Sequence, residues 1–299
     1  MKRTLAVMLT AAALLAACGD DEAADTSDTT AAEAADASDE AVPERIVSMS
    51  PSATEMLFAI GAGDQVVAVD DFSNYPPDAP VTELSAYEPN VEAVATYDPD
   101  LVVVTDSTDL EAGLAEIDID TYVTPAATTL DDTYEQITDL GELTGHAEEA
   151  TDLVEEIKAD IEELVAEVPE REEPLTYYHE LDSTLFSVTS ETFIGELYSL
   201  AGLENVADPA DANGETGGYP QLSAEYLVDA DPDLVFLADT KCCEQTAATF
   251  AARPGFEGLR AVADERVIAL DDDIASRWGP RIVDFLRVIV DAVKAVSAA

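Results

Sequence analysis

The sequence predicts an α/β protein of two similar lobes with mainly parallel sheets, joined by one long rigid helix. Three observations carry this prediction: an uninterrupted amphipathic stretch in the middle of the chain, a repeat on either side of it, and short apolar runs typical of strands buried on both faces. With 299 residues, the chain is long enough to bury the cores of one or two domains.

The amphipathic stretch covers residues 146–168. Its apolar side chains recur at steps of three and four residues: Ala150, Leu153, Val154, Ile157, Ile161, Leu164, Val165 and Val168. The other positions are mostly acidic, so one face of a helix is apolar and the rest is charged. A helix of this length spans roughly 34 Å. No glycine or proline interrupts the stretch, which therefore predicts a stiff connection between two lobes.

The repeat has an offset of 133 residues. Residues 92–106 read EAVATYDPDLVVVTD, and residues 225–239 read EYLVDADPDLVFLAD. Each copy predicts a short helix, an Asp-Pro turn and a buried strand. A weaker echo pairs residues 48–61 with 187–202, each interpreted as a strand end, a Ser/Thr-rich turn and a helix closed by glycine. Chance reuse of α/β units is the alternative to duplication, but the shared Glu and Asp-Pro-Asp-Leu favour duplication.

The remaining elements follow from turn residues and apolar runs. Further strands are expected at residues 45–48, 66–69, 119–123, 175–179 and 267–270. Further helices are expected at 133–143 and 282–296, and residues 271–281 are expected to form a loop. The predicted boundaries are a first lobe at 43–143, the connecting helix at 144–170 and a second lobe at 171–299.

The beginning of the chain, residues 1–17, predicts a signal peptide. Lys2 and Arg3 precede an apolar run, residues 5–17, that is too short to span a membrane. The run leads into Leu-Ala-Ala-Cys18, which resembles the lipobox of bacterial lipoproteins. The resemblance implies cleavage before Cys18 and a lipid on its thiol. The lipid would anchor the protein to the cell membrane on its extracytoplasmic side. An ordinary signal peptide with an incidental cysteine is the alternative.

Charge limits the partners of this protein. Residues 18–42 are almost entirely Ala, Asp, Glu, Ser and Thr with no aromatic residue, which predicts a disordered acidic tether. Without residues 1–17 the chain carries 11 basic and 65 acidic groups, a net charge near −54. Such a surface repels nucleic acid and anionic lipid headgroups. The sequence contains only four lysines. Adaptation to high external salt and an acidic host proteome are alternative explanations for this low number, and the composition favours neither.

Several motifs occur in a characteristic order: RIVSMSPSATE at 45–55, FSNYPP at 72–77, TFIGEL at 192–197, YPQLS at 219–223 and GPR at 279–281. In this order they resemble the iron-siderophore and vitamin B12 class of extracytoplasmic solute-binding proteins, over residues 43–299. The resemblance implies a ligand cleft between two lobes and delivery of the ligand to an ABC permease driven by its ATPase. We expect an iron-siderophore ligand, with cobalamin or haem as alternatives in the same role.

The same resemblance implies which side chains bind the ligand: Phe72, Tyr87, Tyr219, Arg277 and Trp278. The B12 binders usually have tryptophan where Tyr87 and Tyr219 stand, so tyrosine at both places favours a chelated ferric iron complex. Independently, loops at the carboxyl ends of parallel strands are where open α/β sheets bind ligands. For any one of these aromatics, a packed surface side chain is the alternative.

Three other sites have competing interpretations. Glu92 and Glu225 hold equivalent repeat positions; the resemblance implies contacts to permease arginines, and favourable placement at helix N-termini is the alternative. His179 ends a predicted strand, from which it would face the cleft and could bind a haem iron. For Cys242 and Cys243 three interpretations are open: a vicinal disulfide, two free thiols, or a role in contacting the ligand.

Other function classes are weaker. An enzyme, a sensor and an adhesive lipoprotein all remain compatible with duplicated α/β lobes, because fold alone does not determine function. No catalytic Ser-His-Asp set and no phosphate-binding glycine loop is present in the sequence. We therefore expect a monomeric, non-enzymatic receptor with no resident cofactor, no directly bound metal and no nucleic-acid partner.

Overall fold

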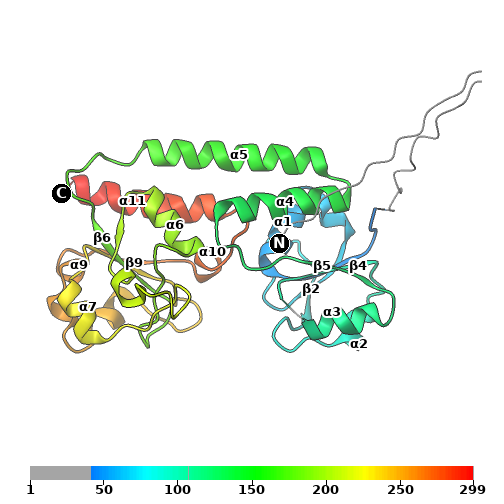
Figure 1. Cartoon of the computed structure of the whole chain (residues 1–299), viewed down its shortest axis with the longest axis horizontal. Helices are drawn as coiled ribbons and strands as arrows, with labels where there is room; N and C mark the ends of the chain where they lie inside the picture. Colours follow the sequence, from blue (N-terminus) through cyan, green and yellow to red (C-terminus); the bar gives the residue numbers. More distant parts are fainter. Residues whose placement is uncertain (1–41, 107, 299) are drawn as a thin grey trace, which may run out of the picture. The chain divides into compact units, whose positions relative to one another are not determined.

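The computed structural model describes residues 42–106 and 108–298 (Figure 1). The predicted signal peptide, Cys18 and nearly all of the acidic tether lie outside the described residues. Residues 42–299 form one compact unit.

The first lobe contains a five-stranded parallel sheet in the order β3-β2-β1-β4-β5. Its strands are β1 (Ile46–Met49), β2 (Val66–Asp70), β3 (Val81–Leu84), β4 (Leu101–Val104) and β5 (Asp120–Val123). Its helices are α1 (Pro51–Ala59), α2 (Val91–Ala95), α3 (Thr108–Ala115) and α4 (Leu130–Thr144), with the 3-10 turn η1 (Ala62–Gln65). The inner strands β1 and β4 are buried throughout, as parallel strands covered on both faces should be.

The second lobe repeats this arrangement with four parallel strands in the order β7-β6-β8-β9. The strands are β6 (Thr176–Glu180), β7 (Glu204–Asn205), β8 (Leu234–Leu237) and β9 (Val267–Ala269). The helices are α6 (Phe193–Leu200), α7 (Ala224–Ala230), α8 (Ala247–Ala251), α9 (Arg260–Ala263), α10 (Asp272–Ala275) and α11 (Ile282–Ala298), with 3-10 turns η2 (Asp208–Asp211) and η3 (Phe256–Gly258). The strand order matches the first sheet without β3, so the prediction of two similar α/β lobes with parallel sheets is confirmed.

The repeat is visible in the backbone as well as in the topology. Asp98 and Asp231 both have positive φ, +49° and +42°, a left-handed conformation that aspartate tolerates better than most residues. Two positions later, Asp100 and Asp233 each accept a hydrogen bond, 3.0 Å long, from a backbone N–H where the first strand of their own sheet begins. Residues 133 positions apart therefore make the same contacts, which supports duplication of the unit.

The connecting helix is α5 (Ala147–Ala166), slightly shorter than the predicted 146–168. Gly145, with φ +77°, ends α4, and the chain then turns back so that α5 packs along α4. Gly141 permits a close approach of the two helices, because a Cβ there would lie 2.3 Å from that of Ala150. In Figure 1, α5 runs past both sheets, and it also packs against α11.

Two local predictions were wrong, and one strand was not predicted. Residues 271–281 are not entirely a loop, because Asp271 caps the short helix α10 by accepting a hydrogen bond from the N–H of Asp273. Ser187 is not a strand end; β6 ends earlier, at Glu180. β3 was not predicted because it is an edge strand whose sequence, VTEL, has no continuous apolar run and is largely exposed.

The main hydrophobic core is continuous from one lobe to the other. It includes Met56 of α1, Ile157 of α5, Phe236 of β8 and Phe285 of α11, all nearly or fully buried. Within the described part of the chain, no helix combines the length and the apolar character needed to cross a membrane.

Candidate ligand-binding site

Two exposed aromatic rings lie in loops at the carboxyl ends of the first sheet. Phe72 follows β2 and is 49% exposed, and Tyr87 follows β3 and is 82% exposed. Their ring centroids are 5.3 Å apart in an edge-to-face arrangement, the geometry that the ring quadrupoles favour. The structure therefore brings these two predicted site residues together.

The second lobe contributes Tyr219, which is 45% exposed, and Phe186, which is 38% exposed. Both follow strands at their carboxyl ends, and their segments run antiparallel: Phe186 pairs with Gln221, and the N–H of Ser187 donates to the carbonyl of Pro220 at 2.9 Å. We call Phe72, Tyr87, Phe186 and Tyr219 the aromatic face. Phe186 was not among the predicted site residues, although an apolar side chain just before the Ser/Thr-rich turn was a usable signal.

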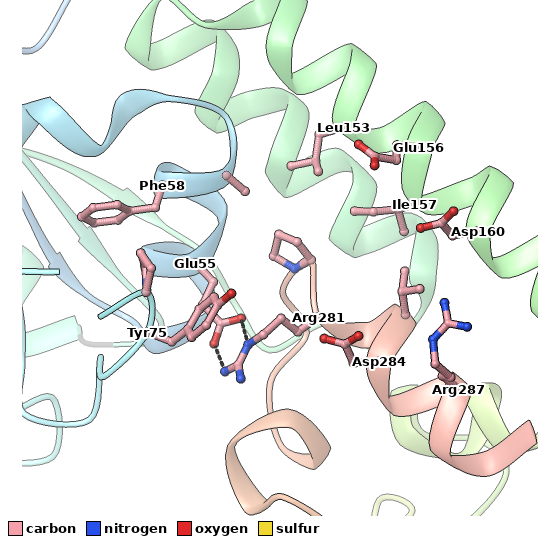
Figure 2. A pocket seen from close by; sticks show the side chains of 14 residues that line it. Glu55, Phe58, Tyr75, Leu153, Glu156, Ile157, Asp160, Arg281, Asp284 and Arg287 are labelled. Atoms are coloured by element: carbon pink, nitrogen blue, oxygen red, sulfur yellow. Dashed lines mark hydrogen bonds and ion pairs between the residues drawn. The ribbon is translucent and has the colours of Figure 1, made fainter. Parts of the chain in front are cut away.

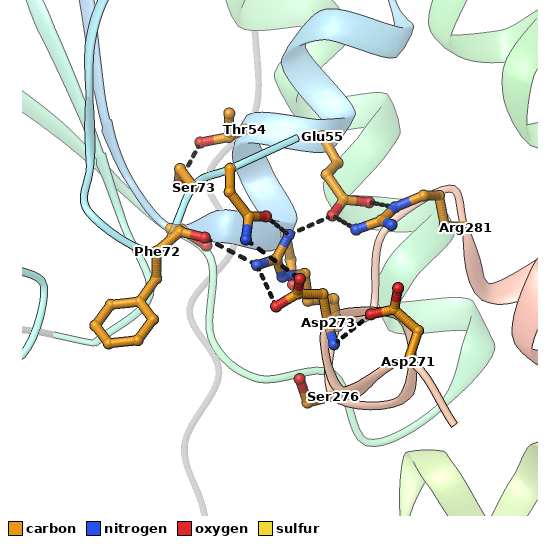
Figure 3. A network of polar contacts seen from close by, with 12 residues as sticks. Thr54, Glu55, Phe72, Ser73, Asp271, Asp273, Ser276 and Arg281 are labelled. Atoms are coloured by element: carbon orange, nitrogen blue, oxygen red, sulfur yellow. Dashed lines mark hydrogen bonds and ion pairs between the residues drawn. The ribbon is translucent and has the colours of Figure 1, made fainter. Parts of the chain in front are cut away.

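Arg277 lies beneath the Phe72 loop rather than free at the surface. It is 8% exposed, and its guanidinium donates to the carbonyl of Phe72 at 2.8 Å and to the side chains of Glu55 at 2.9 Å and Asn74 and Asp273 at 3.0 Å each. Figure 3 shows this network, with the ring of Phe72 pointing away from it. Arg277 belongs to the second lobe, so the carboxyl-end loops of the two sheets meet here.

A second arginine completes the contact between the lobes. The Nε of Arg281 donates to Oε2 of Glu55 at 2.8 Å, and its Nη2 binds Oε1 of the same carboxylate. Glu55 is almost completely buried on α1. A buried carboxylate is stable only with such compensation. We call Glu55, Arg277 and Arg281 the interlobe clamp.

Beside the clamp, Asp70 at the end of β2 is fully buried. Burial raises the pKa of its carboxyl group, although the hydroxyl of Ser73 and the backbone N–H of Phe72 oppose the rise. Thr54 donates to Ser73 at 3.0 Å, and Ser73 donates to Asp70. These side chains hold the loop that carries Phe72.

Trp278 is half-buried and packs against the main core. Its indole N–H donates to Oε1 of Gln136 on α4 at 3.0 Å, and its backbone N–H donates to the hydroxyl of Ser52 at 3.3 Å. The residue therefore joins the second lobe to the first, close to the interlobe clamp.

His179 lies in the core, whereas the sequence-based expectation placed it facing the cleft. The side chain is 0% exposed, its Nδ1 lies 2.8 Å from the hydroxyl of Tyr198, and the ring packs against Phe285. Burial lowers the pKa of the imidazole to about 3, so it is neutral. A core position of this kind cannot provide an axial ligand to a haem iron.

Cys242 and Cys243 form a disulfide in the exposed loop after β8. The carboxylate of Asp272 accepts hydrogen bonds of 2.8–2.9 Å from the backbone N–H groups of residues 240–242. Lys241 pairs with Asp271 and Asp273. The disulfide loop is therefore tied to the same segment, residues 271–281, that carries the interlobe clamp.

Glu92 and Glu225 are exposed in the first turns of α2 and α7. The preceding caps are equivalent as well: Asn90 and Ser223 each accept a hydrogen bond from the backbone N–H three residues later. Among the described residues, neither glutamate carboxylate has a hydrogen bond or ion pair. Permease docking and helix-dipole placement are both compatible with this geometry.

An acidic pair that was not predicted, Glu180 and Asp239, lies at the carboxyl ends of β6 and β8. Glu180 accepts two 2.6 Å hydrogen bonds from Arg253. The neighbouring Asp239 is fully buried, and within the described part of the chain both of its carboxylate oxygens are without a hydrogen-bond partner. Burial, with the charge of Glu180, raises the pKa of Asp239 to about 7.

Both lobes thus present exposed aromatic rings in loops at the carboxyl ends of their strands, and the interlobe clamp holds the loop that carries Phe72. Exposed rings of this kind suit contact with a bulky small molecule. The profile of the family described as "Periplasmic binding protein" matches residues 46–274, most of the chain. The chain belongs to the periplasmic binding protein family.

Among the described residues, no three His, Cys, Asp or Glu side chains are grouped to hold a metal ion.

Similar members of this family include the cobalamin-binding protein of Halobacterium salinarum, which is 32% identical over 81% of this chain and 67% of its own length. The ABC transporter substrate-binding lipoprotein YvrC of Bacillus subtilis, itself uncharacterised, is 28% identical over 96% of this chain and 95% of its own. A crystal structure of a possible iron-binding periplasmic solute-binding protein of Staphylococcus epidermidis superposes with a TM-score of 0.73 at 25% identity, covering 85% of this chain and 99% of its own. These similarities confirm the family resemblance noted in the sequence.

Proposed function

We propose that this protein is the substrate-binding component of an ABC importer and that its ligand is a corrinoid. The aromatic face carries the proposal: four exposed rings, contributed by both lobes, lie in loops at the carboxyl ends of the strands. The similarity to a cobalamin-binding protein supports the choice of ligand. A ferric siderophore, the ligand expected first from the sequence, is the second candidate, and the tyrosines at positions 87 and 219 favour it.

The charges near the aromatic face favour a neutral or cationic ligand. Arg277 donates to the carbonyl of Phe72, and both Arg277 and Arg281 are engaged by the buried carboxylate of Glu55. In the second lobe, Arg253 is paired with Glu180. A triply anionic catecholate complex would need free guanidinium groups converging on it. A corrinoid, with apolar ring faces and amide groups at its edge, requires only aromatic contact and neutral hydrogen-bond partners. A neutral or cationic hydroxamate complex meets the same condition.

A titration of the soluble form, residues 19–299, tests the ligand. The probes are cyanocobalamin, haem, a ferric trihydroxamate and a ferric tricatecholate, each followed through the fluorescence of Trp278, the single tryptophan, and by calorimetry. We expect cyanocobalamin to bind with submicromolar affinity and the tricatecholate not to bind. Binding of the trihydroxamate alone would select the second candidate, and binding of none of the four would reject the proposed ligand class.

The proposal includes the location and partners of the protein. After cleavage before Cys18, a lipid on this cysteine would anchor a monomer outside the cell membrane, and the protein would deliver ligand to a permease and its ATPase without catalysing a reaction. Mass spectrometry of the mature protein tests the anchor directly. An N-terminal fragment with acyl chains on Cys18 supports it, whereas an unmodified cysteine or a different cleavage point rejects it.

A further inference from the structure

A recess separate from the aromatic face lies between the connecting helix and both lobes. Its volume is about 420 Å³, and α1, the Tyr75–Pro76 turn, α5 and the first turns of α11 form its walls (Figure 2). None of the four rings of the aromatic face lines it. The volume is within the range of small-molecule sites, roughly 300–1,000 Å³.

The inner surface of the recess is apolar. Phe58 comes from α1, Leu153 and Ile157 from α5, and Val283 from α11. Ile157 and Val283 are buried, whereas Phe58 and Leu153 are only half-buried. An apolar body placed here would remove the remaining exposed surface of these side chains from water, which is favourable at about 25 cal/mol per Å².

The rim of the recess is acidic. Glu156 and Asp160 line it from α5, and Asp284 lines it from α11. None of these three carboxylates has an ion pair among the described residues. Arg287 also lines the recess, and its guanidinium likewise has no ion pair among them. Glu55 and Arg281 also line the recess but neutralise each other. The rim therefore carries two more negative charges than positive charges.

The inner wall already accommodates a cation. The guanidinium of Arg281 lies 4.1 Å from the ring centroid of Tyr75, close enough for a cation–π contact. In Figure 2, Tyr75, Arg281 and Glu55 stand together on one side of the recess, while Glu156 and Asp160 reach toward it from α5 on the other. The side facing α5 thus offers carboxylates without a cationic partner.

We propose that this recess binds an organic cation with an apolar body, of the alkylammonium or arylalkylammonium class. The apolar part would cover Phe58, Leu153 and Ile157, and the ammonium group would lie between Glu156, Asp160 and Asp284. An organic anion would meet the excess of carboxylates, and an inorganic cation would leave the apolar surface uncovered. The site does not depend on the proposed corrinoid function, since it shares no side chain with the aromatic face.

Calorimetric titration with 4-phenylbutylammonium tests the proposal, using 4-phenylbutanol as the neutral analogue and 5-phenylpentanoate as the anion. We expect affinity to fall in that order. The double variant Glu156→Gln with Asp160→Asn should weaken binding of the ammonium about fivefold, as expected for the loss of two partly exposed ionic contacts, and leave binding of the alcohol unchanged. Arg287→Gln should strengthen binding of the ammonium.

Glu155→Gln with Glu162→Gln is the matched control, because it removes the same charge from exposed positions of α5 that do not line the recess. If the control weakens the ammonium as much as the rim variant does, attraction by net charge explains the result and the site is rejected. No binding of the ammonium, or equal binding of all three probes, also rejects it. Ile157→Trp, which fills the recess, should abolish binding, with circular dichroism confirming that the variant is folded.

Discussion

Arg281, in the second lobe just before α11, donates from Nε to the carboxylate of Glu55, on α1 of the first lobe, at 2.8 Å. The same carboxylate accepts a hydrogen bond from Arg277 at 2.9 Å. Both partners of the buried Glu55 therefore come from the opposite lobe. The lobes are therefore joined by the ion pairs of Glu55 as well as by α5. A form with the lobes apart would have to break these ion pairs or expose them to water.

Glu55→Gln should lower the free energy of unfolding by about 3 kcal/mol, because it leaves the largely buried Arg281 without its carboxylate and Arg277 with Asp273 alone. Urea denaturation measures the change. Glu167→Gln is the control: it breaks the exposed ion pair with Lys294, and exposed pairs contribute little to stability. Equal effects of the two variants would show that the clamp has no special role in stability.

Stability should depend on pH through Asp239. Its folded-state pKa, about 7, is above the ordinary value of 3.8, so the folded protein holds this proton more tightly than the unfolded chain does. The contribution to stability is fully present below pH 4 and is lost as pH rises through 7. Asp239→Asn should remove this dependence, so that the variant gains stability relative to the original protein between pH 5 and pH 8.

The melting temperatures of the two proteins at both pH values measure this effect. Asp229→Asn is the matched control, since Asp229 is exposed on α7 of the same lobe. The interpretation fails if the difference between the Asp239→Asn variant and the original protein is the same at pH 5 and pH 8.

The aromatic face should affect ligand affinity more than stability. Phe72→Ala and Tyr219→Ala each remove an exposed ring, so the melting temperature should change little. Affinity for the ligand identified by titration should fall about tenfold or more, because each ring offers a large contact area. Val288→Ala removes an exposed apolar side chain on α11 and should leave affinity unchanged. An unchanged affinity in both aromatic variants would place the ligand elsewhere.

Glu92→Ala combined with Glu225→Ala tests the proposed docking to the permease. Since both carboxylates are exposed and unpaired among the described residues, ligand affinity and melting temperature should stay nearly constant while transport in reconstituted vesicles is abolished. Glu116→Ala with Glu204→Ala removes one exposed glutamate from each lobe as a control. Normal transport by the first double variant would reject the docking assignment, and a melting temperature several degrees lower would favour the helix-dipole interpretation.

The sequence by itself determined the architecture because the signals for it are local or periodic. The helical spacing of residues 146–168 predicted α5, and the two Asp-Pro-Asp-Leu segments predicted β4 and β8 in equivalent places. Burial on one face of a helix or on both faces of a strand leaves a pattern in consecutive residues. The aromatics Phe72, Tyr87 and Tyr219 were named from the family resemblance, and their position in turn-rich loops agreed with it.

Only the tertiary structure decided what the polar side chains do. Arg277 looked like a free cation for a ligand, but it is neutralised by Glu55, 222 positions earlier in the chain. The sequence could not tell whether His179 faces the cleft or the core. It stands in a strand covered on both faces, where neighbouring residues are equally buried, so no alternation of polar and apolar residues marks its direction. Periodicity reports which face of an element is buried, whereas the partner of a buried charge depends on which elements meet, and that is determined only when the two lobes pack together.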